Sequence, residues 1–248
     1  CLLGVCESAS MLGYNVLITT SNAHDISELQ SLVESNRVDG MLLTRALEDD
    51  RALQYLSQAN FPTALTGTCR YDNIIQVDTD NEGAAEKMTT LLIGKGFRRF
   101  AFLVKDMSYN VDRKRHEGFC RALIKNGISE KDQLFYNGSI RMEFLDAIIE
   151  NIISKKVECI ICGDDEICTM VMSRLQAEGY RIPKDVAIAS LYNSTNLDCY
   201  SPAVTAVSVA ASQMGGTAVR QLIQRLRGEN YEKKTMLDYD ILFRKSTN

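Results

Sequence analysis

The segment Cys159-Ile160-Ile161-Cys162-Gly163-Asp164-Asp165 combines two kinds of side chain that can do chemistry, thiols and carboxylates. The C-x-x-C spacing is a metal or redox signal. No second C-x-x-C pair occurs, however, and the only histidines are His24 and His116. A cysteine in such an apolar run behaves as a small hydrophobic side chain. We therefore predict buried, reduced thiols, with no metal site and no cofactor.

Asp164 and Asp165 follow this apolar run at the carboxyl end of a predicted strand, which is where open α/β sheets bind ligands. An ionised Asp164 only accepts hydrogen bonds, so it suits a ligand rich in hydroxyl or amino donors. The alternative role is capping the helix predicted from Glu166 onward. The two roles are compatible, and we expect Asp165 to be the cap.

No catalytic constellation is recognisable. A glycosidase needs two carboxylates at a matched separation, and a serine hydrolase needs a G-x-S-x-G elbow. Gly94-Lys95-Gly96 lacks both the spacing and the Lys-Ser/Thr ending of a nucleotide-binding loop. We therefore predict that the chain is not an enzyme.

The bulk properties exclude several classes of protein. An apolar fraction of 45%, a charged fraction of 24% and three prolines in 248 residues are typical of a globular chain. The net charge of -4 argues against direct binding of a nucleic-acid backbone. The longest apolar runs, such as Phe100 to Val104, are far shorter than the roughly 20 residues of a membrane span. We read no signal peptide, and the eight cysteines in so large a chain favour reduced thiols in the cytoplasm.

The elements that would position these residues alternate between strand and helix patterns. Seven strands are predicted, at 15–20, 38–44, 63–67, 100–105, 133–137, 157–162 and 186–191. Helices with apolar residues at spacings of three and four are predicted at 26–36, 50–59, 82–95, 115–126, 143–154 and 166–178. Gly96, Gly127 and Gly179 stand where a left-handed residue closes a helix. This alternation predicts parallel sheets with helices on both faces, and the length favours two lobes.

Several motifs together resemble one known family. They are Arg115-His116-Glu117-Gly118-Phe119, Ile182 to Leu191, Ser201 to Val207, Met214-Gly215-Gly216-Thr217-Ala218 and Leu242 to Thr247. Over nearly the whole chain the sequence resembles the effector-binding core of the lactose-repressor (LacI/GalR) family of bacterial transcription regulators. The resemblance implies an α/β fold of the periplasmic-binding-protein-like type I, in which two Rossmann-like lobes with parallel sheets are joined by three crossovers.

The resemblance also implies lobe boundaries. The crossovers match positions near Val77 to Asp80, Ser208 to Ala211 and Leu237 to Asp240. The amino-terminal lobe would comprise residues 1–78 and 210–238, and the carboxyl-terminal lobe 79–209 and 239–248, with a ligand cleft between them. Residues from Cys1 onward match the first helix of the family. We therefore expect a fragment of a longer regulator that lacks the first strand and the DNA-binding helix-turn-helix.

In relatives, an arginine at the place of Arg115 starts a helix and binds sugar hydroxyls or a purine. Its rigid fork of five donors suits paired oxygens. The alternative is a surface arginine near a helix start, where its charge would oppose the helix dipole. This mismatch favours ligand binding. Asp164 stands where the family usually has Asn, and Tyr192-Asn193 where sugar-binding members have two aspartates.

Three further positions match the ligand site of relatives. Ile140 and Ala211 stand where relatives often place aromatic rings, so the pocket would differ in size, unless both residues simply pack. Gly67 permits a close backbone approach, or ends a strand. Tyr192 has a stacking face, and its alternative is an ordinary loop tyrosine.

The resemblance predicts an effector-sensing and dimerisation domain. It would bind a small polar metabolite, most simply a carbohydrate, and change operator affinity through the DNA-binding segment. The homodimer would pair through the helix from Glu166 and through Gln213 to Arg227, where Met170, Met172 and Leu222 supply apolar side chains. The alternative is a solute-binding receptor of a sugar transporter, which has the same fold. The Leu242 to Thr247 ending and the cysteines favour the regulator.

Overall fold

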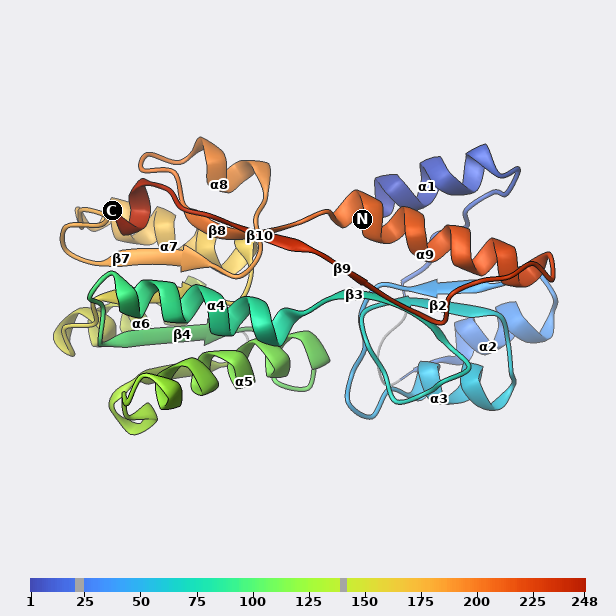
Figure 1. Cartoon of the computed structure of the whole chain (residues 1–248), viewed down its shortest axis with the longest axis horizontal. Helices are drawn as coiled ribbons and strands as arrows, with labels where there is room; N and C mark the ends of the chain where they lie inside the picture. The colour runs from blue at the N-terminus through green and yellow to red at the C-terminus, as the bar shows by residue number, and fades with distance from the viewer. Residues whose placement is uncertain (21–24, 139–141) are drawn as a thin grey trace. The chain divides into compact units, whose positions relative to one another are not determined.

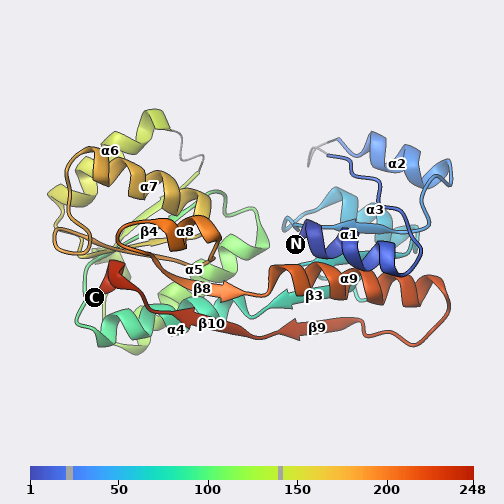
Figure 2. The same cartoon turned by 90° about the horizontal axis from the view of Figure 1, so that it is seen from above.

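The computed structural model describes residues 1–20, 25–138 and 142–248. The chain divides into two compact units, which Figures 1 and 2 show from two directions. Unit 1 comprises Cys1–Thr79, Ser108–Val111 and Ala210–Asp238, and unit 2 comprises Asp80–Met107, Asp112–Val209 and Tyr239–Asn248. The chain thus passes between units close to the three positions proposed as crossovers, and the short segment Ser108–Val111 is a further part of unit 1 that was not predicted.

Unit 1 is built on a parallel sheet in the order β1-β2-β3-β9. Its strands are β1 (Met41–Leu43), β2 (Thr63–Thr66), β3 (Ile75–Thr79) and β9 (Lys234–Leu237). Its helices are α1 (Leu2–Met11), α2 (Ser27–Glu34), α3 (Arg51–Gln58) and α9 (Ala211–Leu226). Successive residues of a strand point to opposite faces, so Leu42 packs with α1 and α9 while Met41 and Leu43 pack with α2 and α3.

Glycines let α1 and α9 of unit 1 pack closely. A Cβ atom on Gly4 of α1 would lie 2.0 Å from the carbonyl oxygen of Ser212. A Cβ atom on Gly215 of α9 would lie 2.4 Å from the carbonyl oxygen of Cys1. The Gly215-Gly216 pair of the sequence motif therefore serves helix packing.

Unit 2 is built on a sheet in the order β10-β8-β7-β6-β4-β5. Its strands are β4 (Phe100–Val104), β5 (Leu134–Asn137), β6 (Cys159–Cys162), β7 (Ala187–Ser190), β8 (Thr205–Val209) and β10 (Tyr239–Leu242). Its helices are α4 (Asn81–Gly94), α5 (Asn110–Lys125), α6 (Met142–Ser154), α7 (Asp165–Ala177) and α8 (Thr195–Cys199), with 3-10 turns at Glu130–Asp132 and Lys245–Thr247. All strand pairs are parallel except β10 with β8.

The core of unit 2 lies on both faces of this sheet. Phe100, Phe102 and Val104 of β4 pack in the cluster that α4 and α5 cover. Ala101 and Leu103 point the other way, into the cluster that α6 and α7 cover. Both faces are buried, which explains why β4 reads as a continuous apolar run.

The mixed α/β architecture with parallel sheets is confirmed, and so are the left-handed closing glycines. Gly96, Gly127 and Gly179 have φ values of 106°, 68° and 81°. Of the predicted strands, the one at 15–20 is wrong: the described chain there is irregular, with Leu17 and Ile18 about 60% exposed. A β-like apolar pattern becomes a strand only where a neighbour supplies hydrogen bonds.

Other elements were missed or misplaced by sequence reasoning. Sequence analysis did not predict β3, β8, β9 and β10 as strands, because each of them overlaps one of the three predicted crossovers. The helix expected from Arg115 begins five residues earlier, at Asn110.

The expected assembly surfaces need a correction as well. Met172 and Leu222 are buried in the cores of their own units, and Met170 packs partly buried against the core of unit 2. They do not supply exposed apolar surface. The exposed apolar side chains of unit 1 include Leu2, Leu3 and Met11, all on α1.

Candidate functional site

The parallel strands of unit 2 bring several polar side chains to one edge of its sheet. Lys105 directly follows β4, Asp164 follows β6 after one glycine, and Tyr192 follows β7 after one leucine. Because β4, β6 and β7 are neighbours and run parallel, their carboxyl ends meet at the same edge. This is the edge at which open α/β sheets bind ligands.

Arg115 is buried at this edge, with 7% of its surface exposed. Its Nη1 donates a hydrogen bond to the carbonyl oxygen of Gly163 at 2.6 Å, and its Nε donates to Oδ1 of Asn81 at 3.2 Å. The guanidinium is thus held by the backbone of Gly163 and the side chain of Asn81. Because α5 begins at Asn110, Arg115 lies in its second turn, and the helix-dipole argument for a functional role does not apply.

Asp164 caps α7. Its Oδ1 accepts a hydrogen bond from the backbone N–H of Ile167 at 2.8 Å, and its Oδ2 lies 2.9 Å from Nζ of Lys105. The prediction that Asp165 is the cap is wrong, since Asp165 is the first residue of the helix. Asp164 is the last residue in extended backbone, with φ at -142°, and this is the conformation that an N-cap requires.

Sequence reasoning missed Lys105. Its ammonium lies between Asp164 and Glu166 and is hydrogen-bonded to both. Burial alone would lower the pKa of Lys105, but the hydrogen bonds and charges of Glu166 and Asp164 raise it above its ordinary value. The available signal was a lone lysine directly after an entirely apolar strand, at a ligand-binding edge.

The Tyr192–Asn193 loop is held by the side chains around it. Ser190 Oγ donates to the carbonyl oxygen of Tyr192 at 2.7 Å, and Asn193 Oδ1 accepts from Nη1 of Arg244 at 3.0 Å. Burial raises the pKa of the Tyr192 phenol, the charge of Asp165 adds to this, and the charge of Arg115 opposes it. Tyr192 therefore lies within electrostatic reach of Arg115, while the amide oxygen of Asn193 is occupied by the carboxyl-terminal segment.

The remaining predicted positions are not part of this group. Ile140 lies outside the described residues. Gly67 and Ala211 belong to unit 1. Gly67 follows β2 with φ at 139°, a conformation that favours glycine, and donates its N–H to the carbonyl of Val77 at 2.9 Å. Ala211 is the first residue of α9. Their ligand-binding roles stay predictions.

The cysteines offer little chemistry. All eight, each within the described part of the chain, are free thiols. Burial raises the pKa of Cys159 and Cys162, and it raises that of Cys120 to about 11, so these thiols are not activated as thiolates. No group of three His, Cys, Asp or Glu side chains suited to a metal ion is found among residues 1–20, 25–138 and 142–248.

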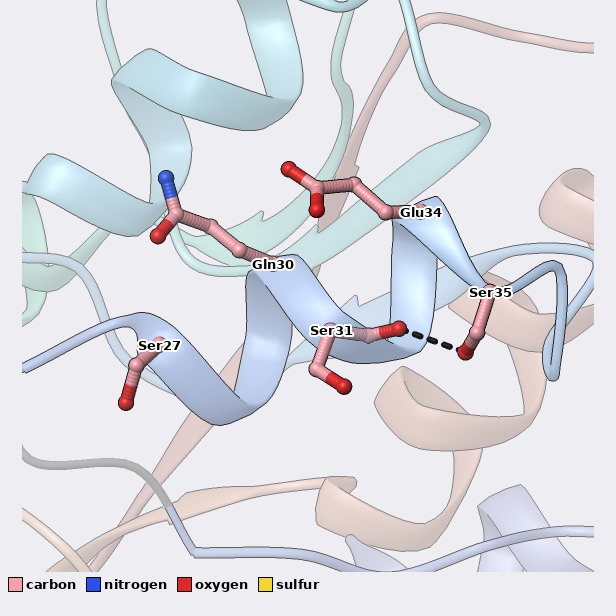
Figure 3. A pocket seen from close by; sticks show the side chains of 5 residues that line it. All are labelled: Ser27, Gln30, Ser31, Glu34 and Ser35. Atoms are coloured by element: carbon pink, nitrogen blue, oxygen red, sulfur yellow. Dashed lines mark hydrogen bonds between the residues drawn. The ribbon is translucent and has the colours of Figure 1, made fainter.

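A second surface feature is an open groove on unit 1, along α2. Figure 3 shows the side chains that line it, which are Ser27, Gln30, Ser31, Glu34 and Ser35. These residues, at spacings of three and four, lie on one face of α2 and at its C-terminal end, and all except Gln30 are exposed. This groove is a solvated helix face, without the buried polar groups that a specific ligand site needs. In the described part of the chain, no helix is both long and apolar enough to span a membrane.

Comparison with known proteins identifies the fold and the family. Residues 89–247 match the periplasmic binding protein-like domain. The HTH-type transcriptional regulator CelR of Thermobifida fusca is 27% identical over 252 residues, covering 99% of this chain and 74% of that regulator.

Solved structures agree with this. A putative transcriptional regulator LacI from Bacillus cereus subsp. cytotoxis superposes with a TM-score of 0.91 at 28% identity, covering 99% of this chain and 89% of that one. A transcriptional regulator CelR–cellobiose complex superposes with a TM-score of 0.87 at 27% identity, covering 99% of this chain and 77% of that one. These similar proteins are transcription regulators rather than enzymes. The chain therefore belongs to the periplasmic binding protein-like domain family and is the sensing domain of a LacI-type transcription regulator.

Proposed function

We propose that this sensing domain binds a small polar metabolite, a carbohydrate, through the side chains at the carboxyl edge of the unit 2 sheet. The binding residues are Arg115, Asp164 and Tyr192, with Asn193 holding the loop. The ligand-binding roles of Ile140, Gly67 and Ala211 stay predictions of the family resemblance. The effector would shift a conformational equilibrium of a cytoplasmic homodimer, and a DNA-binding segment of the full regulator would carry that shift to the operator.

The observation that carries the proposal is the buried guanidinium of Arg115, which is hydrogen-bonded to the backbone carbonyl of Gly163, the residue before Asp164. A buried arginine that is oriented by a backbone carbonyl is already in place for a ligand, because its planar fork loses little freedom on binding. Tyr192 adds an aromatic face at the same edge of the sheet, just after β7. Donor, acceptor and aromatic face together are what a polyhydroxyl ligand requires.

The proposal is tested by calorimetric titration of the protein with cellobiose, maltose, D-glucose and D-xylose. One of these saccharides should bind, and Arg115→Lys, which keeps the charge but loses the planar fork, should weaken that binding roughly tenfold or more. Arg121→Lys is the matched control, because Arg121 lies on the same helix and pairs with Glu82 and Glu86. Failure of all four saccharides, or equal binding by Arg115→Lys, would contradict the proposal.

The regulatory half of the proposal has its own experiment. The full-length regulator should bind DNA from its own promoter, and the bound saccharide should change that affinity by a measurable factor in a fluorescence-anisotropy titration. A saccharide that binds tightly but leaves DNA affinity unchanged would instead support the alternative, a solute-binding receptor of a transporter.

A further inference from the structure

Lys105 is a charged residue at the carboxyl edge of the unit 2 sheet, and the proposed site does not include it. It stands directly after β4, and 29% of its side chain is exposed. Its nearest partners, Asp164 and Glu166, are both at the start of α7. Lys105 thus joins the end of one strand to the helix that follows the neighbouring strand.

The hydrogen bonds leave unused capacity on both members of the Lys105–Asp164 pair. An ammonium group has three N–H donors, and Asp164 and Glu166 take up two of those of Lys105. Asp164 gives Oδ1 to the helix cap, while Oδ2 faces the ammonium at 2.9 Å and retains a second lone pair. A donor and an acceptor are therefore presented side by side at an edge that solvent reaches.

The charges around the Lys105–Asp164 pair determine which ligand groups can bind there. The first turn of α7 and its cap carry three carboxylates, Asp164, Asp165 and Glu166, which suit the positive end of the helix dipole. Lys105 is the cation paired with two of them. With Lys105 present, its remaining N–H can donate a hydrogen bond to a neutral hydroxyl group. Without it, two partly exposed carboxylates lose their counter-charge and attract a cationic group instead.

We infer that Lys105 and Asp164 form a donor–acceptor couple that binds adjacent hydroxyl groups of a neutral saccharide, and that Lys105 determines selectivity against amino sugars. This inference rests on the proposed carbohydrate function and adds the residue that sets its specificity. One hydroxyl accepts from Lys105 Nζ while its neighbour donates to Asp164 Oδ2. An ammonium substituent in place of a hydroxyl has no acceptor for the lysine and is repelled by it.

The test compares two disaccharides with the same β-1,4 skeleton, cellobiose and the corresponding disaccharide of glucosamine, at a pH where the amines are protonated. Wild-type protein should prefer cellobiose. Lys105→Met keeps the length of the side chain without its charge, and it should weaken cellobiose binding and move the affinity ratio roughly tenfold or more toward the glucosamine disaccharide. Lys105→Arg should restore part of the preference, because it keeps the charge.

Lys114→Met is the matched control. Lys114 also bridges two carboxylates, at 3.2 Å from Glu82 and 2.7 Å from Glu117, but it lies on the α4–α5 surface. Its substitution should leave the affinity ratio unchanged.

The outcomes separate the inference from the proposed function. Cellobiose binding with an affinity ratio that Lys105→Met does not change overturns the role of Lys105 and leaves the carbohydrate function standing. If neither disaccharide binds, the inference is also overturned. In that case, binding of maltose, D-glucose or D-xylose would still support the proposed carbohydrate function. A change in thermal stability alone, without a change in the ratio, shows that Lys105 is only a structural ion-pair partner.

Discussion

At the scale of single residues, Asp164 combines a helix cap with an ion pair to Lys105, and substitutions separate the two roles. Asp164→Ala removes the acceptor for the Ile167 N–H and should lower the free energy of unfolding by about 1 kcal/mol. Asp164→Asn keeps a good cap and should cost less, because Asn is a favoured N-cap residue. Urea denaturation at neutral pH measures both values. Equal losses in the two variants would show that the charge, and not the cap, stabilises α7.

Arg115 also has a structural role that its sequence position did not reveal. A surface arginine could be replaced by alanine at little cost in stability, but the buried guanidinium of Arg115 donates to the Gly163 carbonyl at 2.6 Å. Its loss leaves that carbonyl without this donor and should cost about 1–3 kcal/mol. Arg121→Ala, on the exposed side of the same helix, should cost less than about 1 kcal/mol. Chemical denaturation that ranks the two variants equally would contradict this assignment.

At the scale of elements, the contact between α4 and α5 depends on Gly118. A Cβ atom there would lie 2.1 Å from the carbonyl oxygen of Glu82, which is backbone and cannot rotate away. Gly118→Ala should therefore destabilise the protein by about 1–3 kcal/mol through overpacking. Gly94→Ala, at the end of α4 with no atom within 4 Å of the added Cβ, should be neutral or stabilising by about 0.5 kcal/mol. Thermal unfolding of the pair is the measurement, and a neutral Gly118→Ala would show that the helices separate easily.

Glu158, next to β6 in the unit 2 sheet, should make a pH-dependent contribution to the free energy of unfolding. Burial raises the pKa of this carboxyl, but hydrogen bonds from the backbone N–H groups of Arg98 and Arg99, at 2.6 and 3.0 Å, and the Arg99 charge lower it overall. A depressed pKa stabilises the folded state above the unfolded value of 4.5, and this stabilisation is lost as the pH falls through the lower folded value. Glu158→Gln should thus be less stable than wild type at pH 7, with the difference shrinking below about pH 4.5. A difference that is constant from pH 7 to pH 3 would exclude this linkage.

At the scale of the whole molecule, the expected homodimer stays a prediction, and α1 supplies a place to test it. Leu3 on α1 is 67% exposed, and operator half-sites related by two-fold symmetry require paired regulators. The full-length protein should sediment as a dimer at micromolar concentration, and Leu3→Glu should shift it toward monomer. Ile124→Glu is the matched control, since Ile124 on α5 is equally exposed. A monomeric wild-type protein, or equal dissociation in both variants, would contradict an α1 interface.

The sequence by itself determined the features that depend on local pattern. Apolar runs such as Phe100 to Val104 predicted strands buried on both faces, because their side chains need neighbours on each side. The glycine after each of several helices predicted its end, because the left-handed conformation favours glycine. Cys159 and Cys162 were predicted as buried thiols for the same local reason, their apolar setting. Local signals sufficed for the α/β class and for the family resemblance.

Only the tertiary structure decided which of the polar residues meet. Residues 15–20 have the pattern of a strand, but they pair with no strand in the described part of the chain, so pairing and not propensity settled their conformation. Asp164 rather than Asp165 caps α7, since the exact register between strand end and helix start is set by packing. Lys105 belongs to the candidate site because β4 and β6 pair side by side. This pairing brings Lys105 to Glu166, about 60 positions away in the sequence. Sheet order is a non-local property, because it follows from how buried faces pack and not from any one segment.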